Sequence, residues 1–557
     1  MDNSQIADVF SLLSKLMDIH GENSFKAKSY AVAAYTIEKM PVELAELPGD
    51  KVFSIKGIGD AIGKKITELR QTGKLNILEE YLQKTPVGIL EMLNIKGLGP
   101  KKIAVIWKEM GLETIGELLY ACNENRLLLF KGFGEKTQQN VKTYIEFYLA
   151  SKGSYLYAEI ESYALQLHQQ LQKQFPHRQF EHTGAFARQS ETIDILEWVS
   201  TAGNSELEQF FLAHSFSVTE KNETGIRFKA ENNVAIIFYT AHTENFGSIL
   251  FYTNCAGTFL NEWEKRFPAM QTYGSEEDVF KSAGIPYILP CLREKEMVIG
   301  TAMSGLLPEL IRPEDVKGVI HSHSNWSDGR QSVEDMANAA IENGFEYLVI
   351  SDHSKSAFYA NGLKEDRIKE QHLYIDSLNE KLYPFKIFKS IEADILNDGN
   401  LDYHSPVLAT FDLVIASVHS NLKMTEDKAM LRLLTAIQNP YTTILGHMTG
   451  RLLLSREGYP VDHKKIIDTC VDHDVAIELN AHPRRLDIDW RWIDYALESG
   501  AIISIDPDAH NTEGYKDIRY GVLAAQKAGL TKQNNLSSYS LPEFETFLRK
   551  RKEKKGI

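Results

Sequence analysis

The chain has 557 residues, of which 43% are hydrophobic and 25% charged, and its formal net charge is −15. This length exceeds what one hydrophobic core organises, so we expect about three to five folding units. No apolar run approaches the roughly 20 residues of a membrane-spanning helix, and the polar start does not resemble a signal peptide. The four cysteines are scattered without a CxxC pair. Composition therefore predicts a cytoplasmic protein with no membrane partner and no thiolate metal site.

The negative charge is unevenly distributed along the chain. Residues 1–150 contain equal numbers of basic and acidic side chains, so the remainder carries the whole excess. Bound cations would neutralise any part of that excess that serves as metal ligands. The net charge therefore does not exclude nucleic acid as a partner, although it gives no support for one.

Three segments of the first 150 residues share one pattern, in which an apolar residue precedes a Gly-apolar-Gly turn and a helix with basic residues follows. They are FSIKGIGDAIGKKI with Gly57 and Gly59, LNIKGLGPKKIAVI with Gly97 and Gly99, and LLFKGFGEKTQQNV with Gly132 and Gly134. Glycines let the backbone approach a ligand closely, and the next helix presents free N–H groups to an anion. Lysines add positive charge at the same places, namely Lys64, Lys65, Lys101, Lys102 and Lys136.

These segments resemble helix-hairpin-helix motifs, which bind DNA through its phosphates without reading sequence. Residues 6–80 also resemble the small amino-terminal domain of family X DNA polymerases. In that family a lysine of the second hairpin helix can form a Schiff base with an abasic sugar, and the resemblance places Lys65 at this position. Ala61 stands where the family often has a further phosphate-contacting lysine, so a plain phosphate contact is the alternative role for Lys65.

The resemblance to family X polymerases continues into a palm-like region, but the catalytic carboxylates are largely missing. The segment GAFARQSETIDILEWVS is similar to the family's nucleotide-binding signature at Gly184, Arg188, Glu191, Thr192 and Asp194. Alanine stands at 185 and 187, where the family has serine and arginine, and Asp194 alone remains of a paired D-x-D motif.

Two further polymerase motifs are also altered. Ala235 in NNVAIIFYT stands where the family has a third aspartate, and TNCAGTFL from Thr253 replaces the thumb-side motif. Nucleotidyl transfer requires two metal ions held by concentrated negative charge, which one carboxylate does not supply. We therefore expect a catalytically inactive palm and thumb, unless another carboxylate such as Glu197 has rebuilt the site.

Seven short apolar runs in the last 240 residues each end on a metal-binding side chain. They are VKGVIHSH, YLVISDH, IFKSIEAD, LVIASVH, TTILGHM, VAIELNAH and AIISIDPDAH, and the intervening segments, such as SVEDMANAAIENG, have amphipathic helical patterns. This alternation predicts repeated βα units that close into a barrel, where the carboxyl ends of parallel strands meet at one mouth. Packing a barrel does not require imidazoles there, whereas a metal cluster does.

The segment HSHSNWSDG resembles the opening motif of PHP (polymerase and histidinol phosphatase) domains, with Ser324 in place of threonine. The resemblance extends over residues 316–557, and bacterial family X polymerases carry such a domain at this end. It implies a cluster of three divalent metals (Mn²⁺, Zn²⁺ or Fe) held by nine ligands: His321, His323, Asp328, His353, Glu392, His419, His447, Asp508 and His510. Glu392, on a central strand, is the candidate bridging ligand.

Three further residues near these strand ends are candidates for substrate binding. Arg451 and Arg485 lie just beyond ligand-bearing strands, where a substrate phosphate would sit; a surface salt bridge is the alternative for each. His482 ends a strand but lies outside the family's ligand set, so we expect it to line the mouth.

The predicted architecture is multidomain. Residues 1–85 and 86–152 form two helical helix-hairpin-helix domains, residues 153–241 a degenerate α+β palm, residues 242–305 a thumb-like domain, and residues 316–557 a distorted (β/α)7 PHP barrel.

Four functions remain open from the sequence. The favoured one is a metal-dependent 3′→5′ exonuclease or 3′-end-processing phosphodiesterase that acts in repair on gapped, nicked or 3′-ended DNA without sequence preference. The alternatives are an active gap-filling polymerase, a small-molecule phosphatase of the histidinol-phosphate kind, and a DNA-binding scaffold without activity. The sequence gives no prediction of oligomeric state.

Overall fold

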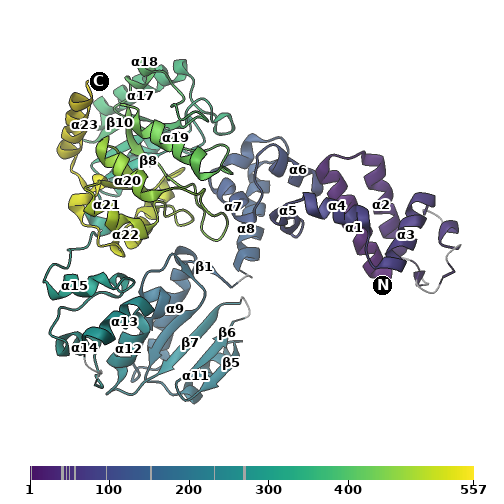
Figure 1. The fold of residues 1–557 in the computed structure, drawn as a ribbon, viewed down its shortest axis with the longest axis horizontal. Helices are drawn as coiled ribbons and strands as arrows, with labels where there is room; N and C mark the ends of the chain where they lie inside the picture. The colour runs from purple at the N-terminus through teal and green to yellow at the C-terminus, as the bar shows by residue number, and fades with distance from the viewer. Residues whose placement is uncertain are drawn as a thin grey trace. The chain divides into compact units, whose positions relative to one another are not determined.

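The computed structural model (Figure 1) describes residues 1, 3–38, 40, 43–44, 47–48, 51–55, 58–95, 97–150, 153–230, 233–267 and 271–557. Two compact units are present: residues 1–123 with 127–146, and residues 124–126 with 147–557. In the described parts of the chain, no helix is long and apolar enough to cross a membrane.

The first unit is helical throughout its described residues. Phe10 of the first helix stacks on Tyr30 of the second, with ring centroids 5.8 Å apart, inside a core that also buries Leu13 and Ile37. The elements are α1 (Asn3–His20), α2 (Ser24–Glu38), η2 (Lys51–Ser54), α3 (Asp60–Thr72), α4 (Asn76–Lys84), α5 (Val87–Met92), α6 (Pro100–Lys108), α7 (Ile115–Asn123), η3 (Arg126–Leu129) and α8 (Glu135–Ala150).

The palm-like region of the second unit is built on a five-stranded sheet of order β2-β4-β7-β6-β5, in which β4 and β7 are parallel and the other pairs antiparallel. Trp198 on β4 is fully buried between the sheet and the helices. Its elements are β1 (Tyr155–Leu156), α9 (Tyr157–Gln174), β2 (Phe180–Thr183), α10 (Gly184–Ala187), β3 (Thr192–Ile193), β4 (Leu196–Ser200), α11 (Asn204–Ala213), β5 (Ser217–Asn222), β6 (Gly225–Lys229) and β7 (Ala235–Thr240).

The thumb-like region consists of short helices around an aromatic core. The ring centroids of Phe251 and Trp263 lie 4.7 Å apart, and the buried Arg293 forms an ion pair with Glu276. The elements are α12 (Phe246–Asn254), α13 (Gly257–Arg266), α14 (Glu276–Ser282), η4 (Pro290–Leu292) and α15 (Met297–Met303).

Seven parallel strands form the remaining sheet in chain order, which confirms the barrel predicted from the sequence. A parallel bridge between Ser322 and Ala509 joins the first and last runs and closes the sheet. Every strand is almost entirely buried, as expected for parallel strands covered on both faces. The strands are β8 (Gly318–Ser322), β9 (Tyr347–Ile350), β10 (Lys386–Asp394), β11 (Leu413–Ser417), β12 (Thr442–Leu445), β13 (Ala476–Asn480) and β14 (Ile503–Asp506).

Helices surround the barrel, and the last helix contributes to its interior. Phe544 on α23 stacks on Tyr347 of β9 at 4.7 Å, in the apolar cluster that fills the inside of the sheet. The elements are η5 (Pro313–Asp315), α16 (Val333–Glu342), η6 (Phe358–Ala360), α17 (Glu365–Leu382), α18 (Ser405–Leu408), α19 (Glu426–Gln438), α20 (His463–Asp472), η7 (Trp490–Trp492), α21 (Ile493–Glu498), η8 (Thr512–Asp517), α22 (Ile518–Gln526), η9 (Lys532–Asn534), η10 (Leu536–Ser538) and α23 (Leu541–Lys555).

Candidate metal centre

The nine predicted ligands converge at the carboxyl ends of the barrel strands. None of their side chains is more than 5% exposed. Among the described residues, three groups have ligand atoms close enough together to hold an ion: His323, Asp328, His353 and His510; His321, His323 and Asp508; and His353, Glu392 and His419. His323 and His353 each belong to two groups, so the three positions adjoin one another.

Glu392 lies at the centre of this cluster. Its Oε1 is 3.0 Å from Nε2 of His419 and 2.9 Å from Nε2 of His447. Its Oε2 lies 2.9 Å from Nδ1 of His353 and 3.7 Å from Nε2 of His323. Because the two carboxylate oxygens face different imidazoles, Glu392 has the geometry of a bridging ligand.

Many polar atoms in the cluster are buried without a hydrogen-bond partner. They include Nε2 of His321, both ring nitrogens of His353, Oδ2 of Asp328, Oε2 of Glu392 and Nε2 of His510. Leaving such atoms unsatisfied is costly, and buried polar groups are almost always paired. Divalent ions at the three positions would satisfy them, and mixed imidazole and carboxylate ligands suit Mn²⁺, Zn²⁺ and Fe. The residues therefore fit the metal cluster that the sequence implies.

Buried carboxylates orient the ligand histidines from behind. Nδ1 of His321 is hydrogen-bonded to Glu478, and Nδ1 of His419 to Asp394. Such partners fix the ring orientation and leave the other nitrogen for a metal. Neither residue was predicted from the sequence, although Asp394 is two residues beyond Glu392, where a strand side chain faces the same side.

The loop after β8 is held by another carboxylate. The backbone N–H and the hydroxyl of Ser324 both donate to Asp352, at 2.8 and 2.7 Å. Gln371 donates to the same side chain at 2.6 Å. Serine at position 324 therefore supplies a hydroxyl in the place where the family motif has threonine.

Neighbouring charges in the cluster shift the pKa values of the predicted ligands in the direction opposite to the effect of burial. Burial by itself lowers the pKa of His353, but Asp328 and Glu392 raise it well above its ordinary value. Burial raises the pKa of Asp508, whereas the neighbouring histidines, His321 first, hold it well below its usual range. Without a metal ion, the carboxylates are therefore ionised and pair with protonated imidazole; a bound cation would replace that proton as their partner.

Two of the three candidate substrate residues lie beside the cluster. Nε of Arg485 is 3.8 Å from Oδ2 of Asp508, and its side chain is 5% exposed. The ring of His482 accepts a hydrogen bond at Nδ1 from the backbone of Arg484, and burial lowers its pKa to about 3. A neutral imidazole and a guanidinium thus line the mouth.

Arg451 is placed differently from the prediction. Its guanidinium is bonded to Glu191 of the palm-like region, to Asp489 at 2.6 Å, and to the carbonyl oxygens of Arg485 and Leu486. These partners make it a largely buried ion pair between palm and barrel, close to the salt bridge that was its alternative role. Contact with a substrate phosphate stays a prediction.

Comparison with known proteins is consistent with this geometry. Family models match at residues 1–75 (helix-hairpin-helix domain), 89–143 (SAM-like helix-hairpin-helix tandem) and 320–482 (PHP domain). A DNA polymerase/3′-5′ exonuclease of Bacillus subtilis is 32% identical over 99% of this chain and 100% of its own. The chain belongs to the bacterial family X DNA polymerases with a C-terminal PHP domain.

A probable phosphatase of Thermoanaerobacter sp. is 25% identical over 42% of this chain and 96% of its own. A probable phosphatase YcdX of Escherichia coli is 26% identical over 34% of this chain and 77% of its own. Family membership together with the PHP domain makes the protein an enzyme that acts on phosphoester bonds, with DNA as its partner.

The residues of the family's nucleotide-binding signature have other contacts in this member. Glu191 binds Arg451, Nε of Arg188 lies 3.2 Å from Glu294 of the thumb-like region, and Asp194 accepts a hydrogen bond from Ser154 at 2.5 Å. The carboxylate of Glu197 accepts from the hydroxyl of Tyr239 at 2.7 Å. In the described part of residues 153–305, no three potential ligands come together as they do in the barrel.

Thr192 and Ala235 belong to different strand pairs. Thr192 on β3 pairs with Leu156 of β1, whereas Ala235 on β7 pairs with Lys229 of β6. Gly184 adopts a positive φ of 66° against the carboxylate of Glu197, and a Cβ there would lie 1.6 Å from one of its oxygens. The positive φ therefore favours glycine at this position, and a side chain there would displace the Glu197 carboxylate.

The hairpin glycines have open surroundings. Gly97 and Gly132 adopt positive φ values of 93° and 97°, which glycine tolerates best. A Cβ added at Gly59, Gly99 or Gly134 would meet nothing within 4 Å. Gly59 and Gly99 are the N-caps of α3 and α6, so each lies at a helix N-terminus, where backbone N–H groups can bind an anion. Gly57 lies outside the described residues.

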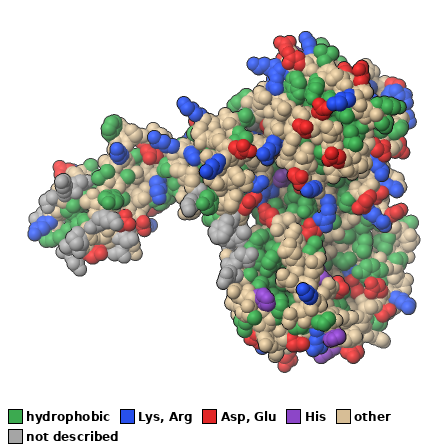
Figure 2. All heavy atoms as spheres, turned by 180° about the vertical axis from the view of Figure 1, so that it is seen from behind, with side chains coloured by type: hydrophobic (Ala, Val, Ile, Leu, Met, Phe, Trp, Pro, Cys, Tyr) green, Lys and Arg blue, Asp and Glu red, His purple; other side chains and the backbone are tan. Residues whose placement is uncertain are grey.

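The hairpin lysines are available at the surface to different degrees. Lys64, Lys101 and Lys136 are exposed, whereas Lys102 and Lys65 are half-buried. Nζ of Lys65 lies 3.5 Å from Glu68. On the face shown in Figure 2, basic and acidic side chains are intermingled, so any phosphate contact there depends on local hairpin geometry more than on an extended basic surface.

Glu392→Gln tests the bridging role directly. Losing the central negative charge among buried imidazoles should reduce bound Mn²⁺ or Zn²⁺ at least tenfold, measured by elemental analysis after dialysis, while circular dichroism stays unchanged. Glu370→Gln, on the exposed surface of α17, is the matched control. Wild-type metal content in folded Glu392→Gln protein would contradict the assignment.

Proposed function

We propose that this family X protein is a metal-dependent 3′→5′ exonuclease, or 3′-end-processing phosphodiesterase, that acts on DNA in repair while its polymerase-like core is inactive. The observation that carries the proposal is the cluster of nine buried predicted ligands: eight of them form three adjoining groups, and the ninth, His447, contacts Glu392. We further propose that three ions of Mn²⁺, Zn²⁺ or Fe occupy them.

The chain's residues at the mouth favour a phosphodiester substrate. When bound, divalent ions of this kind acidify water and neutralise charge on phosphoryl oxygens. Arg485 adds a fixed positive charge beside the cluster, suited to a non-bridging phosphate oxygen. His482 is neutral and half-buried, so it can pack against a sugar or base without repelling the ions.

Exonucleolytic hydrolysis follows from these parts. The oxygen of water forms a bond to the phosphorus of the last internucleotide link while the P–O3′ bond breaks. A nucleoside 5′-monophosphate leaves, and the shortened strand keeps a 3′-hydroxyl after protonation. The hairpins of the first unit would hold the DNA by its backbone, which explains why no sequence preference is expected.

The inactive core is supported by the positions of the remaining carboxylates. Asp194 and Glu197 are each engaged by a hydroxyl group, Ser154 and Tyr239 respectively. Thr192 and Ala235 carry no charge, so two catalytic ions would lack the paired carboxylates they require. The probable-phosphatase relatives, which match less than half of the chain, make a small-molecule phosphatase the competing proposal. The hairpins favour DNA.

His353→Ala should abolish nuclease activity, by at least 10³-fold, because His353 belongs to two of the three ligand groups. Affinity for DNA should change less than twofold, since the hairpins bind it. Release of nucleotides from 3′-labelled gapped DNA with Mn²⁺, together with fluorescence anisotropy, measures both. Near-normal cleavage by the folded variant would disprove the site.

No template-directed extension is expected in Mg²⁺ or Mn²⁺. A gapped duplex with one correct deoxynucleotide should be shortened or left unchanged, because positions 192 and 235 lack carboxylates. Robust incorporation on a denaturing gel would mean that Asp194 and Glu197 have rebuilt a polymerase site. Incorporation lost on Glu197→Gln would identify that carboxylate.

DNA affinity should fall with salt at a modest slope. A protein that neutralises about two to four phosphates gives a log–log slope of roughly −2 to −4, at about −0.9 per contact. Lys101→Ala should flatten the slope by about one contact. Lys15→Ala, exposed on α1 and outside the three hairpins, should leave it unchanged. Equal slopes for wild type and Lys101→Ala would remove that lysine from the interface.

A further inference from the structure

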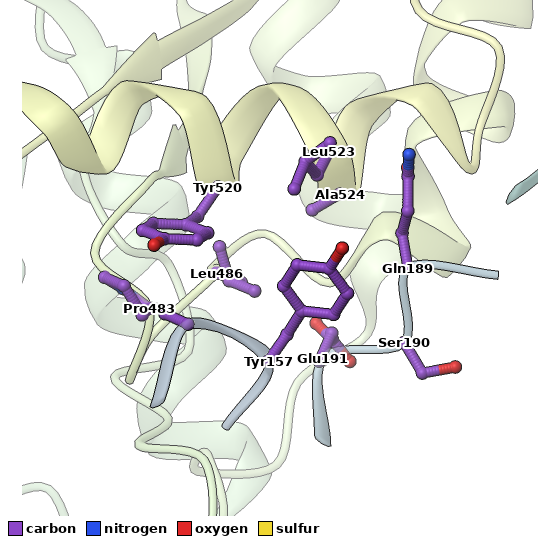
Figure 3. Close-up of a pocket in the computed structure, with 10 residues that line it drawn as sticks. Tyr157, Gln189, Ser190, Glu191, Pro483, Leu486, Tyr520, Leu523 and Ala524 are labelled. Atoms are coloured by element: carbon purple, nitrogen blue, oxygen red, sulfur yellow. The ribbon is translucent and has the colours of Figure 1, made fainter. Parts of the chain in front are cut away.

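One turn of the barrel connects the metal centre to the palm-like region. It comprises residues 482–486, between β13 and η7, and it carries both His482 and Arg485. In Figure 3, Pro483 and Leu486 of this turn face Tyr157 and Glu191 of the palm, with Tyr520 of α22 beside them. The turn is therefore part of the contact between the two regions.

We infer that the inactive palm serves the hydrolase: Glu159 and Glu191 are positioning residues that hold the 482–486 turn and thereby place Arg485 and His482 at the metal centre. This inference rests on the proposed function of that centre. It gives the palm a role that does not require nucleotidyl transfer.

Glu159 holds the turn through Arg484. Its Oε1 lies 2.5 Å from Nη2 of Arg484, whose side chain is only 6% exposed. The other oxygen of Glu159 accepts the backbone N–H of Leu156 at 3.0 Å, which fixes the carboxylate at the start of α9. A rigid palm helix thus determines the position of the residue next to Arg485.

Glu191 holds the same turn through Arg451. The Nε of Arg451 donates to the carbonyl oxygen of Arg485 at 2.9 Å, and Nη2 donates both to Glu191 and to the carbonyl oxygen of Leu486. Glu191 is 8% exposed, so its attraction for the guanidinium is little screened by water. The two carbonyls are thereby fixed from the palm side.

On its opposite side, the turn is connected to the predicted ligands by hydrogen bonds. The backbone N–H of His482 donates to the side chain of Asn480 at 3.1 Å, and Asn480 in turn donates to Asp508 at 3.0 Å. Arg485 lies near the same aspartate. Displacement of the turn by about 1 Å would therefore move the substrate-binding groups relative to the metal positions, which is enough to impair catalysis strongly.

The backbone of the turn depends on external support. Leu486 adopts a φ of 44°, in the left-handed region that L-residues with a side chain rarely occupy. Such a conformation persists only when surrounding contacts impose it. The bond from Arg451 to the Leu486 carbonyl is one of those contacts, so removing its palm partner should loosen the turn.

The interface itself supplies a matched control. Arg519 on α22 forms a two-pronged ion pair with Glu161 of α9, with Nη2 2.6 Å from Oε1. This pair joins the same two regions, yet Arg519 lies outside the turn. Glu161→Gln should therefore weaken the contact without moving Arg485, whereas Glu159→Gln and Glu191→Gln should move it.

The test uses the full chain and two readouts. The first readout is hydrogen exchange of the Arg485 and Leu486 amides, which donate to the His482 carbonyl, in the protein without substrate. These amides should exchange at least tenfold faster in Glu191→Gln and Glu159→Gln than in Glu161→Gln. Steady-state hydrolysis of bis(p-nitrophenyl) phosphate with Mn²⁺ should show kcat/KM falling about tenfold in the same two variants at unchanged metal content. Glu191→Gln should add much less than its own full loss to Arg485→Ala, because most of its effect passes through Arg485.

Two results would overturn the inference: equal exchange in all three variants, or additive losses of Glu191→Gln and Arg485→Ala. If wild type hydrolyses no phosphodiester while exchange still separates the variants, the positioning contact stands and the proposed nuclease function fails.

Discussion

The buried carboxylate of Glu392 is the interaction on which the working part of this protein depends. It is fully buried and faces imidazoles on both of its oxygens. A buried charge of this kind is tolerable only when it is paired or binds metal. The barrel meets this requirement by ending each of its seven strands at one mouth, so residues far apart in sequence surround a single carboxylate.

Where the barrel closes at this mouth, the backbone adopts unusual φ values and an irregular strand register. His321 and Asp508 adopt positive φ values of 58° and 52°, and the pairing of β8 with β9 shifts register between Val319 and Ser322. Both residues are predicted ligands, and each directly precedes one partner of the Ser322–Ala509 bridge that joins the first and last strand runs. Strained backbone often marks functional sites, since the surrounding structure maintains it for the sake of side-chain direction.

In the palm-like region, residues of the nucleotide-binding signature form ion pairs with other parts of the protein. Arg188 and Glu191 stand at positions of the nucleotide-binding signature, yet Arg188 binds Glu294 and Glu191 binds Arg451 of the barrel. Lys527 of the barrel also reaches Glu294, at 2.9 Å. These ion pairs join palm, thumb and barrel.

The sequence by itself determined the barrel and most of the site. Apolar runs that end on histidine or carboxylate are local signals: all seven form strands, and six of them place predicted ligands at one mouth. The residues that contact the predicted ligands from other strands and loops could be identified only from the tertiary structure. Glu478 and Asp394 orient histidines from other strands, and Arg451 and Arg485, alike in sequence, separated: one faces the palm and the other the metal positions. Strand periodicity fixes which side of the sheet a residue faces. The ion-pair partner of a long charged side chain depends instead on which groups the whole fold brings within its reach.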